Sequence, residues 1–304
     1  YCPIVTATAE TRTLAAPTYI GQELLVYLKT DGGDVTVTVA NAFDDDGHTV
    51  FMLRDVGDEM LLRASESGAT KIWKSVFREK KSARRSQVEF FDDFLGVLTE
   101  AQLNAKGYST QKDTSNTILC VAGQNGVLQL TTDNTDDDTI YISGGLDLKA
   151  AQGIVFETRF QVDDITNLGM FFGVSDALVE TSALMPANRS VATVTSTATD
   201  MVGFVYDTDS TTDKLFGLGV KNNTDTAQIG DTIAPVNATW MTLRIEISAA
   251  GTASYFIDGT AYGAATANSV TTTVPLTWII SMCNRSGSVH NVLVDYIYVS
   301  SLRA

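Results

Sequence analysis

The chain has 304 residues and a net charge of −15, so it is long enough for two domains and acidic enough to repel nucleic acid and anionic membranes. No apolar run reaches the roughly 18 residues that a membrane-spanning helix needs. The three cysteines, Cys2, Cys120 and Cys283, lack the paired spacing of a zinc site, and their odd number excludes a complete disulfide framework. We expect small buried thiols, with a Cys120–Cys283 disulfide as the open alternative.

Residues 21–76 contain several short runs in which apolar and polar side chains alternate. The clearest is Val35–Val39, where valine and threonine alternate. The others lie at residues 24–28, 50–53, 60–62 and 71–76. A period of two residues is typical of strands with one buried face. Several short strands in so small a span predict a small β-barrel or β-sandwich domain over residues 1–76.

Residues 77–87 form a short basic segment in an otherwise acidic chain. They hold five basic residues and one acidic residue, and they show no apolar period. Three interpretations are open: a solvated linker, an arm that docks on an acidic partner surface, or a nucleic-acid contact, which the acidic flanking domains oppose. The candidate partner-binding residues of this basic arm are Arg78, Lys80, Lys81, Arg84 and Arg85.

Residues 88–304 contain a longer series of predicted strands and one predicted helix. Thr99 and Gln102 fit a capping box at the start of that helix, and Gly107 fits the position after its end. Asp258-Gly259 fits the tight turn of a hairpin. Many strands without interleaved helices predict two antiparallel sheets packed face to face in a jelly-roll β-sandwich. The predicted strands lie at residues 117–122, 127–132, 139–143, 153–162, 168–175, 201–208, 215–221, 240–248, 253–258, 261–265, 276–284 and 291–300.

Three stretches of the second domain resemble the concanavalin A-like lectin/glucanase sandwich. They are "GIVFETRFQV" with "LGMFFGVSDA" (153–162 and 168–177), "WMTLRIEISAAGTASYFIDGTAYG" (240–263) and "HNVLVDYIYVSSLRA" (290–304). The resemblance covers residues 88–304. It implies an all-β chain in which a concanavalin A-like β-sandwich follows the small N-terminal domain.

Further stretches are similar to structural proteins of tailed bacteriophages, in particular capsid decoration (cement) proteins. They are "FFDDFLG" (90–96), "MVGFVYDTDSTTDKLFGLGV" (201–220), "TRTLAAPTYIGQELLVYLKTDGGDVTVTVA" (11–40) and "KIWKSV" (71–76). This resemblance implies a non-catalytic virion protein on the outer surface of the capsid. It would bind the major capsid protein and assemble as a dimer or trimer. The alternative is a carbohydrate-binding module of a phage tail or fibre, which would bind a surface glycan.

The carboxylates of the second domain give little sign of catalysis. Glucanases of this fold place carboxylates on one face of one strand, in an E-x-D-x-E arrangement, at the separation that glycoside hydrolysis needs. Here Arg159 stands two residues after Glu157, which predicts an ion pair on one face of the strand, and Glu246 stands alone. We therefore predict that the chain is not an enzyme.

One set of carboxylates remains as a candidate ligand site. Asp207, Asp209 and Asp213 lie between two predicted strands, where they form either a solvated turn or a site for calcium or sugar hydroxyls. The acidic run at residues 133–138 raises the same question but lacks the glycine and the closing glutamate of a calcium-binding loop. Apart from this calcium alternative, we expect no cofactor.

Overall fold

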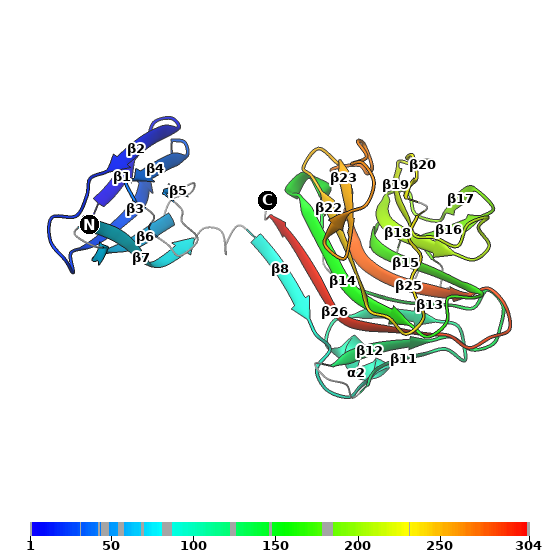
Figure 1. Cartoon of the computed structure of the whole chain (residues 1–304). Coiled ribbons are helices and arrows are strands. Elements are labelled where there is room, and N and C mark those ends of the chain that lie inside the picture. Colours follow the sequence, from blue (N-terminus) through cyan, green and yellow to red (C-terminus); the bar gives the residue numbers. More distant parts are fainter. Residues whose placement is uncertain are drawn as a thin grey trace. The chain divides into compact units, whose positions relative to one another are not determined.

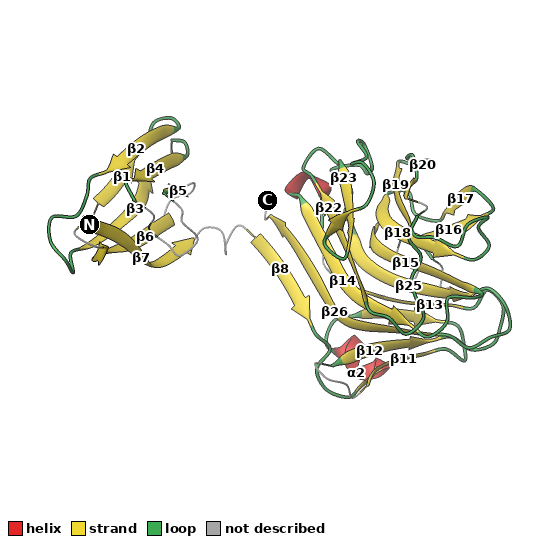
Figure 2. Cartoon of the chain, viewed as in Figure 1, coloured by secondary structure: helices red, strands yellow, loops and turns green. Residues whose placement is uncertain are grey.

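The computed structural model describes residues 2–30, 32–41, 43, 49–53, 58–67, 70–80, 87–121, 126–145, 148–177, 185–230 and 232–302. The chain divides into two compact units, unit 1 (Tyr1–Gln87) and unit 2 (Val88–Ala304) (Figure 1). Both are built from strands, as Figure 2 shows, so the chain is all-β as predicted. Within the described residues, no helix is long and apolar enough to cross a membrane.

Unit 1 is a small β-sandwich of two sheets. One sheet has the strand order β1-β3-β6-β7 and the other has the order β2-β4-β5. β1 runs parallel to β3, and β2 runs parallel to β4. The strands are β1 (Cys2–Val5), β2 (Glu10–Leu14), β3 (Glu23–Thr30), β4 (Val35–Val39), β5 (Val50–Leu53), β6 (Asp58–Ser67) and β7 (Thr70–Lys80).

The core of unit 1 follows from the predicted alternation. In β4 the three valines are buried and the threonines between them are half-buried. Buried side chains of β3, β5 and β6, such as Leu28, Phe51 and Leu62, complete the core. Trp73 of β7 is buried in the same core, and its Nε1 donates to the carbonyl of Ala15 (2.8 Å). A period of two therefore located β3, β4, β5, β6 and β7, but not β1 and β2.

Strands extend into both ends of the linker that was predicted at residues 77–87. β7 continues to Lys80, and β8 already begins at Gln87, so the strands include five of the residues assigned to the arm (77–87). Residues 81–86, which include Lys81, Arg84 and Arg85, lie outside the described residues, and so do the side chains of Arg78 and Lys80.

Unit 2 is a jelly-roll β-sandwich of two large sheets. The first, named here the β14 sheet, has the order β24-β23-β22-β14-β26-β12-β11-β9, and β8 also pairs with β26. Its strands are β8 (Gln87–Asp92), β9 (Leu98–Thr99), β11 (Thr117–Val121), β12 (Val127–Thr131), β14 (Ile154–Val162), β22 (Met241–Ile247), β23 (Ala253–Ile257), β24 (Thr260–Ala261) and β26 (Asn291–Leu302).

The second sheet, named here the β15 sheet, has the order β10-β13-β25-β15-β18-β19-β20, and β21 pairs with β19. A separate hairpin, β16–β17, follows β15 in the chain. The strands are β10 (Ser109–Lys112), β13 (Thr139–Ser143), β15 (Leu168–Ser175), β16 (Ala187–Ser190), β17 (Thr193–Ser196), β18 (Met201–Asp207), β19 (Phe216–Lys221), β20 (Thr224–Asp225), β21 (Ile229–Gly230) and β25 (Thr277–Asn284).

The two sheets differ in what covers their outer faces. Buried and half-buried residues alternate along β14, so one face of that sheet packs on the core and the other is accessible. Every residue of β15, β18 and β25 is buried. A second apolar cluster explains this, because Phe171 and Val205, on the outer face of the β15 sheet, pack with Ala187 and Val194 of the β16–β17 hairpin.

The local turn and cap predictions for unit 2 are confirmed. Helix α2 (Glu100–Ala105) begins with the Thr99–Gln102 capping box, and Gly107 after it has a φ of 99°. Asp258 and Gly259 have φ of 49° and 76°, as a tight hairpin turn requires. The strand predicted at 261–265 is wrong in extent, because β24 covers Thr260–Ala261. A short 3-10 helix, η1, covers Ala150–Gln152.

The cysteines are free thiols. Cys120 lies on β11 and Cys283 on β25, in different sheets, and both are buried. Cys2 on β1 is half-buried. The open alternative of a Cys120–Cys283 disulfide is therefore wrong.

Candidate functional site

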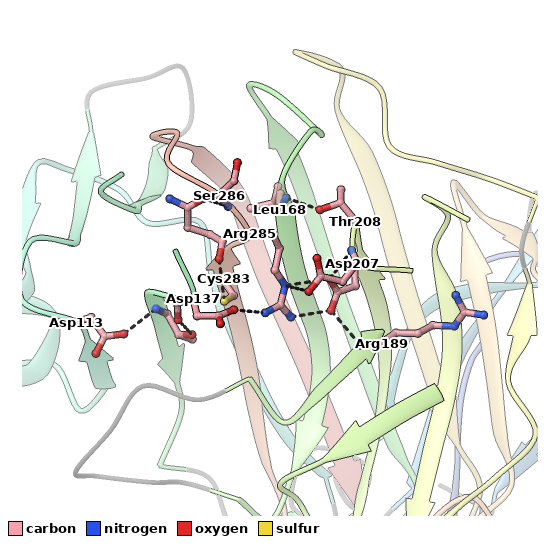
Figure 3. Close-up of polar contacts among 12 residues, drawn as sticks. Asp113, Asp137, Leu168, Arg189, Asp207, Thr208, Cys283, Arg285 and Ser286 are labelled. Carbon is pink, nitrogen blue, oxygen red and sulfur yellow. Dashed lines mark hydrogen bonds and ion pairs between the residues drawn. The ribbon is translucent and has the colours of Figure 1, made fainter. Parts of the chain in front are cut away.

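Asp207 belongs to a buried ion pair (Figure 3). It ends β18, and its side chain is 1% exposed; Arg285, just after β25, has a side chain that is 7% exposed. The Arg285 Nε and Nη2 atoms donate to the two Asp207 carboxylate oxygens at 3.0 and 2.7 Å. The backbone N–H of Arg189 also donates to Asp207 (3.0 Å). Burial lowers the pKa of Arg285, but the hydrogen bond to Asp207, together with the nearby Cys283 and Asp137, more than offsets this, so the pKa is raised.

The other two predicted ligands do not join Asp207 in a metal site. Asp209 is half exposed and lies 3.7 Å from Arg285 Nε, where burial raises its pKa and Arg285 opposes that shift. Asp213 is exposed, and its charge acts on Tyr206. In the described part of the chain, no group of three or more His, Cys, Asp or Glu side chains is placed to hold a metal. The guanidinium of Arg285 supplies the positive charge beside Asp207 that a calcium ion would bring in the alternative interpretation.

The acidic run at residues 133–138 joins the same network. Arg285 Nη1 donates to Asp137 (2.7 Å), which links the run to Asp207 (Figure 3). Asp133 and Asp138 share a hydrogen bond. Burial, with the neighbouring Asp133, raises the pKa of Asp138 to about 6, whereas backbone and side-chain hydrogen bonds lower that of Asp133. Arg285 thus joins the run to the segment after β25 and to the end of β18.

The accessible face of the β14 sheet corrects the prediction for Glu157 and Arg159. Glu157 accepts a hydrogen bond from the Tyr296 hydroxyl (2.7 Å) and lies 3.5 Å from Arg244 Nη1. Arg159 pairs instead with Asp295 (2.8 Å). The predicted Glu157–Arg159 ion pair is therefore wrong.

Glu246 is not isolated either, because Arg244 donates to it at 2.8 and 2.5 Å. Arg244 thus connects Glu246 with Glu157 across two neighbouring strands. On the same face, the guanidinium of Arg159 lies over the Trp240 ring, 4.9 Å from its centroid. This face presents paired charges and aromatic rings to solvent.

A concave pocket lies where β8, the end of α2 and the start of β25 meet. Its volume is about 460 Å³. Sequence analysis missed it, because its walls come from four separate segments. The lining residues are Phe90, Asp92, Lys106, Gly107, Tyr108, Gly144, Gly145 and Trp278.

Three aromatic rings form the apolar part of this pocket. Phe90 is half-buried and stacks on Trp278, with centroids 5.9 Å apart and an interplanar angle of 23°. Tyr108 meets Trp278 edge-on at 6.0 Å. Phe90 therefore presents its ring at the pocket while Trp278, which is fully buried, forms the floor.

Polar groups of opposite charge lie beside these rings. Asp92 accepts hydrogen bonds from the backbone N–H of Phe94 (2.7 Å) and from the Tyr108 hydroxyl. Burial and this bond to Asp92 raise the pKa of Tyr108, so the phenol stays protonated. Lys106, which ends the helix, is exposed at the rim. The pocket thus combines an acceptor, a cation and apolar ring surface.

The floor also holds a buried donor. Trp278 Nε1 has no hydrogen-bond partner among the described residues, and an unsatisfied buried donor is unfavourable by about 1–3 kcal/mol. It lies against Gly144, where a Cβ would come within 2.1 Å of Nε1. Only glycine fits there, so the pocket wall approaches the indole N–H closely.

Comparisons with known proteins give structural likeness alone. No protein family matches the chain, and no curated protein does. The T. cruzi calreticulin globular domain aligns with a TM-score of 0.48 and 11% identity, over 69% of this chain and 87% of that one. A carbohydrate esterase from the Shiga toxin-encoding bacteriophage phi24B aligns at 0.40 and 16%, over 69% and 100%. The endo-β-1,4-glucuronan lyase of Trichoderma reesei aligns at 0.42 and 11%, over 70% and 94%.

The prediction that the chain is not an enzyme is corrected here. Two of these similar structures are a carbohydrate esterase and a lyase, so a sandwich of this kind does not by itself exclude catalysis. The sequence argument rested on one carboxylate motif, whose absence concerns glycoside hydrolysis only. At this similarity the comparisons assign no reaction and no ligand to this chain.

Proposed function

We propose that unit 2 is a lectin-like carbohydrate-binding domain, and that the aromatic pocket at β8 holds a neutral sugar ring. The observation that carries this proposal is the lining of the pocket, in which Phe90 and Tyr108 stand beside Asp92 and Lys106. Apolar walls with a few convergent polar groups are typical of small-ligand sites. The acidic surface of the chain disfavours a polyanionic glycan, which leaves neutral sugars as the expected class.

Each group has a part in this binding. The face of Phe90 packs on the C–H face of a pyranose ring, and Asp92 and Lys106 bond to hydroxyl groups at its edge. Trp278, which is fully buried and stacked on Phe90, holds that ring in place at the pocket.

A screen of neutral glycans, followed by calorimetry on the full chain, tests this proposal. Phe90→Leu and Lys106→Ala are expected to weaken binding by about fivefold each, because each removes one interaction of about 1 kcal/mol. Trp278→Phe keeps an aromatic ring in the floor and removes only the buried N–H, so it should weaken binding less than Phe90→Leu does. Phe91→Ala is the matched control, since Phe91 is the next residue of β8 and is 60% exposed. Binding that is absent, or equal in all four variants, would refute the pocket assignment.

We further propose that this domain is carried on the outer surface of a virion, where unit 1 attaches it to the major capsid protein as a dimer or trimer. The resemblance of unit 1 and of the "FFDDFLG" stretch to phage decoration proteins supports this proposal. Counting copies per purified particle tests it: many copies over the shell fit decoration, whereas a few copies fit a tail or fibre.

The basic arm contributes to this attachment in the same proposal. Exposed ion pairs are worth only about 0.2–1 kcal/mol each and weaken with salt. The five-fold serine variant is therefore expected to weaken particle binding more at low salt than at high salt. Equal binding at low salt would reduce the segment to a linker. The residues changed are Arg78, Lys80, Lys81, Arg84 and Arg85.

A further inference from the structure

Unit 1 has an open side where its two sheets end in short strands. β1 and β2 each stand at the end of their sheet and have one hydrogen-bonded neighbour among the described strands. They follow each other in the chain, and the turn between them is fixed at Thr6, whose Oγ1 accepts from Gly32 N (2.7 Å) and donates to Gly33 O (3.1 Å). Two sheet edges therefore lie side by side with their backbone groups available.

The other edge of the β1 sheet is connected to neighbouring segments. Ser75 of β7 donates its backbone N–H to Phe43 O (2.7 Å), and Trp73 of β7 donates to Ala15 O (2.8 Å). Phe43 is buried in the core of unit 1. No comparable bond joins β1 to β2 in the described part of the unit. The sandwich is thus covered at β7 and open between β1 and β2.

An apolar groove of about 240 Å³ lies between these two strands. Ile4 and Leu14 line it, and it reaches Val26 and Val37, which are core residues with only 2% exposure. Val5, at its rim, is 57% exposed. Apolar side chains of an added strand would bury against the core here.

The charge of the groove indicates which kind of segment it can bind. Arg12 lines the groove and donates to both carboxylate oxygens of Glu10 (2.9 and 3.0 Å), so these two charges neutralise each other. The other lining residues are uncharged. An uncharged segment therefore fits this groove best, even though the chain is acidic overall.

The two edges differ as hydrogen-bonding templates. Glu10 N donates to Asp34 O of the segment before β4, so alternation turns the N–H groups of Thr11 and Thr13 toward the open side. β1 carries Pro3, which has no N–H. β2 is therefore the edge that can pair along its whole length.

We propose that unit 1 binds an extended, uncharged segment of a partner protein as an added strand on β2, with alternate apolar side chains of valine or isoleucine size in the groove. This is strand addition, in which backbone bonds give affinity and pockets for alternate side chains give selectivity. The inference deepens, and rests on, the attachment role proposed for unit 1; it names the chemistry of the partner segment.

The test uses an acetylated and amidated peptide of alternating valine and threonine, added to the full chain. We expect saturable binding, slower amide exchange at Thr11 and Thr13, and slower alkylation of Cys2, which lines the groove. Thr13→Pro removes an outward donor but no bond to β4, so it should weaken binding by about tenfold. Thr13→Val keeps that donor and is the matched control.

The outcomes separate this inference from the other proposals. Absence of saturable binding, equal affinity in Thr13→Pro and Thr13→Val, or protection confined to another edge would overturn strand addition. Glycan binding by unit 2, measured in the same variants, should not change. If Thr13→Pro also fails to release the chain from particles, attachment occurs elsewhere even where the peptide binds.

Discussion

Replacing Arg285 by glutamine is expected to destabilise unit 2 more than removal of any exposed ion pair. The variant leaves the Asp207 carboxylate 1% exposed and without its cation. Breaking a buried pair in this way is unfavourable by about 3–5 kcal/mol. The lost contact to Asp137, which is 74% exposed, adds no more than about 1 kcal/mol. We therefore expect the free energy of unfolding of unit 2 to fall by about 3–5 kcal/mol.

Urea unfolding followed by tryptophan fluorescence measures this change. A Trp73→Phe background restricts the signal to unit 2, because the remaining tryptophans, Trp240 and Trp278, both belong to it. Arg159→Gln is the control, since the Arg159–Asp295 pair lies on the accessible face and should be worth about 1 kcal/mol or less.

A second variant separates charge burial from lost packing. Asp207→Asn in the Arg285→Gln chain removes the buried charge, so the double variant should be more stable than Arg285→Gln alone. A cost no larger than that of Arg159→Gln, or a double variant less stable than the single one, would refute the reasoning.

Three further predictions concern the polar features of unit 2. The raised pKa of Asp138, about 6, means that the folded state keeps a proton that the unfolded chain releases above about pH 4, so this carboxyl lowers stability as pH rises. Asp138→Asn should then stabilise by about 1 kcal/mol at pH 7, after allowance for solvent screening, and have no effect near pH 4; equal effects at both pH values in urea unfolding would contradict this. Thr99→Ala should destabilise by about 1 kcal/mol in the same assay through loss of the capping box, whereas a Thr99→Ser control should not. Calcium should leave the melting temperature unchanged, because Arg285 already neutralises Asp207; a saturable rise that is lost in Asp209→Ala would show an ion site.

The features predicted well from sequence are those in which the information is local. Alternation located β4, because burial of one strand face is set by residues two apart. Asp258-Gly259 and the Thr99 cap were found for the same reason, since a turn or a cap depends on a few consecutive residues. β1 and β2 were missed, because Pro3 and the mixed Glu10–Leu14 run show no clear alternation.

The partners of charged residues could not be predicted, because they depend on strand register. Glu157 and Arg159 are two residues apart and lie on one face, which made an ion pair between them plausible on local grounds. Register instead places Glu157 opposite Arg244, 87 residues away in the chain. Arg285 is 78 residues from Asp207, and no pattern within either segment links them. For this reason the sequence allowed a calcium site at Asp207, whereas the structure pairs this carboxylate with Arg285.

The covered face of the β15 sheet decides where unit 2 can bind a ligand. Packing of the β16–β17 hairpin on Phe171 and Val205 leaves that face apolar and closed. The hairpin is held by Arg189, which bonds to Asp207 and whose guanidinium lies 3.8 Å from the centroid of the Phe216 ring, so opening it would disturb the buried ion pair as well. Among the described residues of unit 2, two surfaces are accessible to a ligand: the outer face of the β14 sheet, where the charges are already paired, and the pocket at β8. The β8 pocket is the concave one of these two and is lined by aromatic rings beside Asp92 and Lys106, and this is why the carbohydrate proposal rests there.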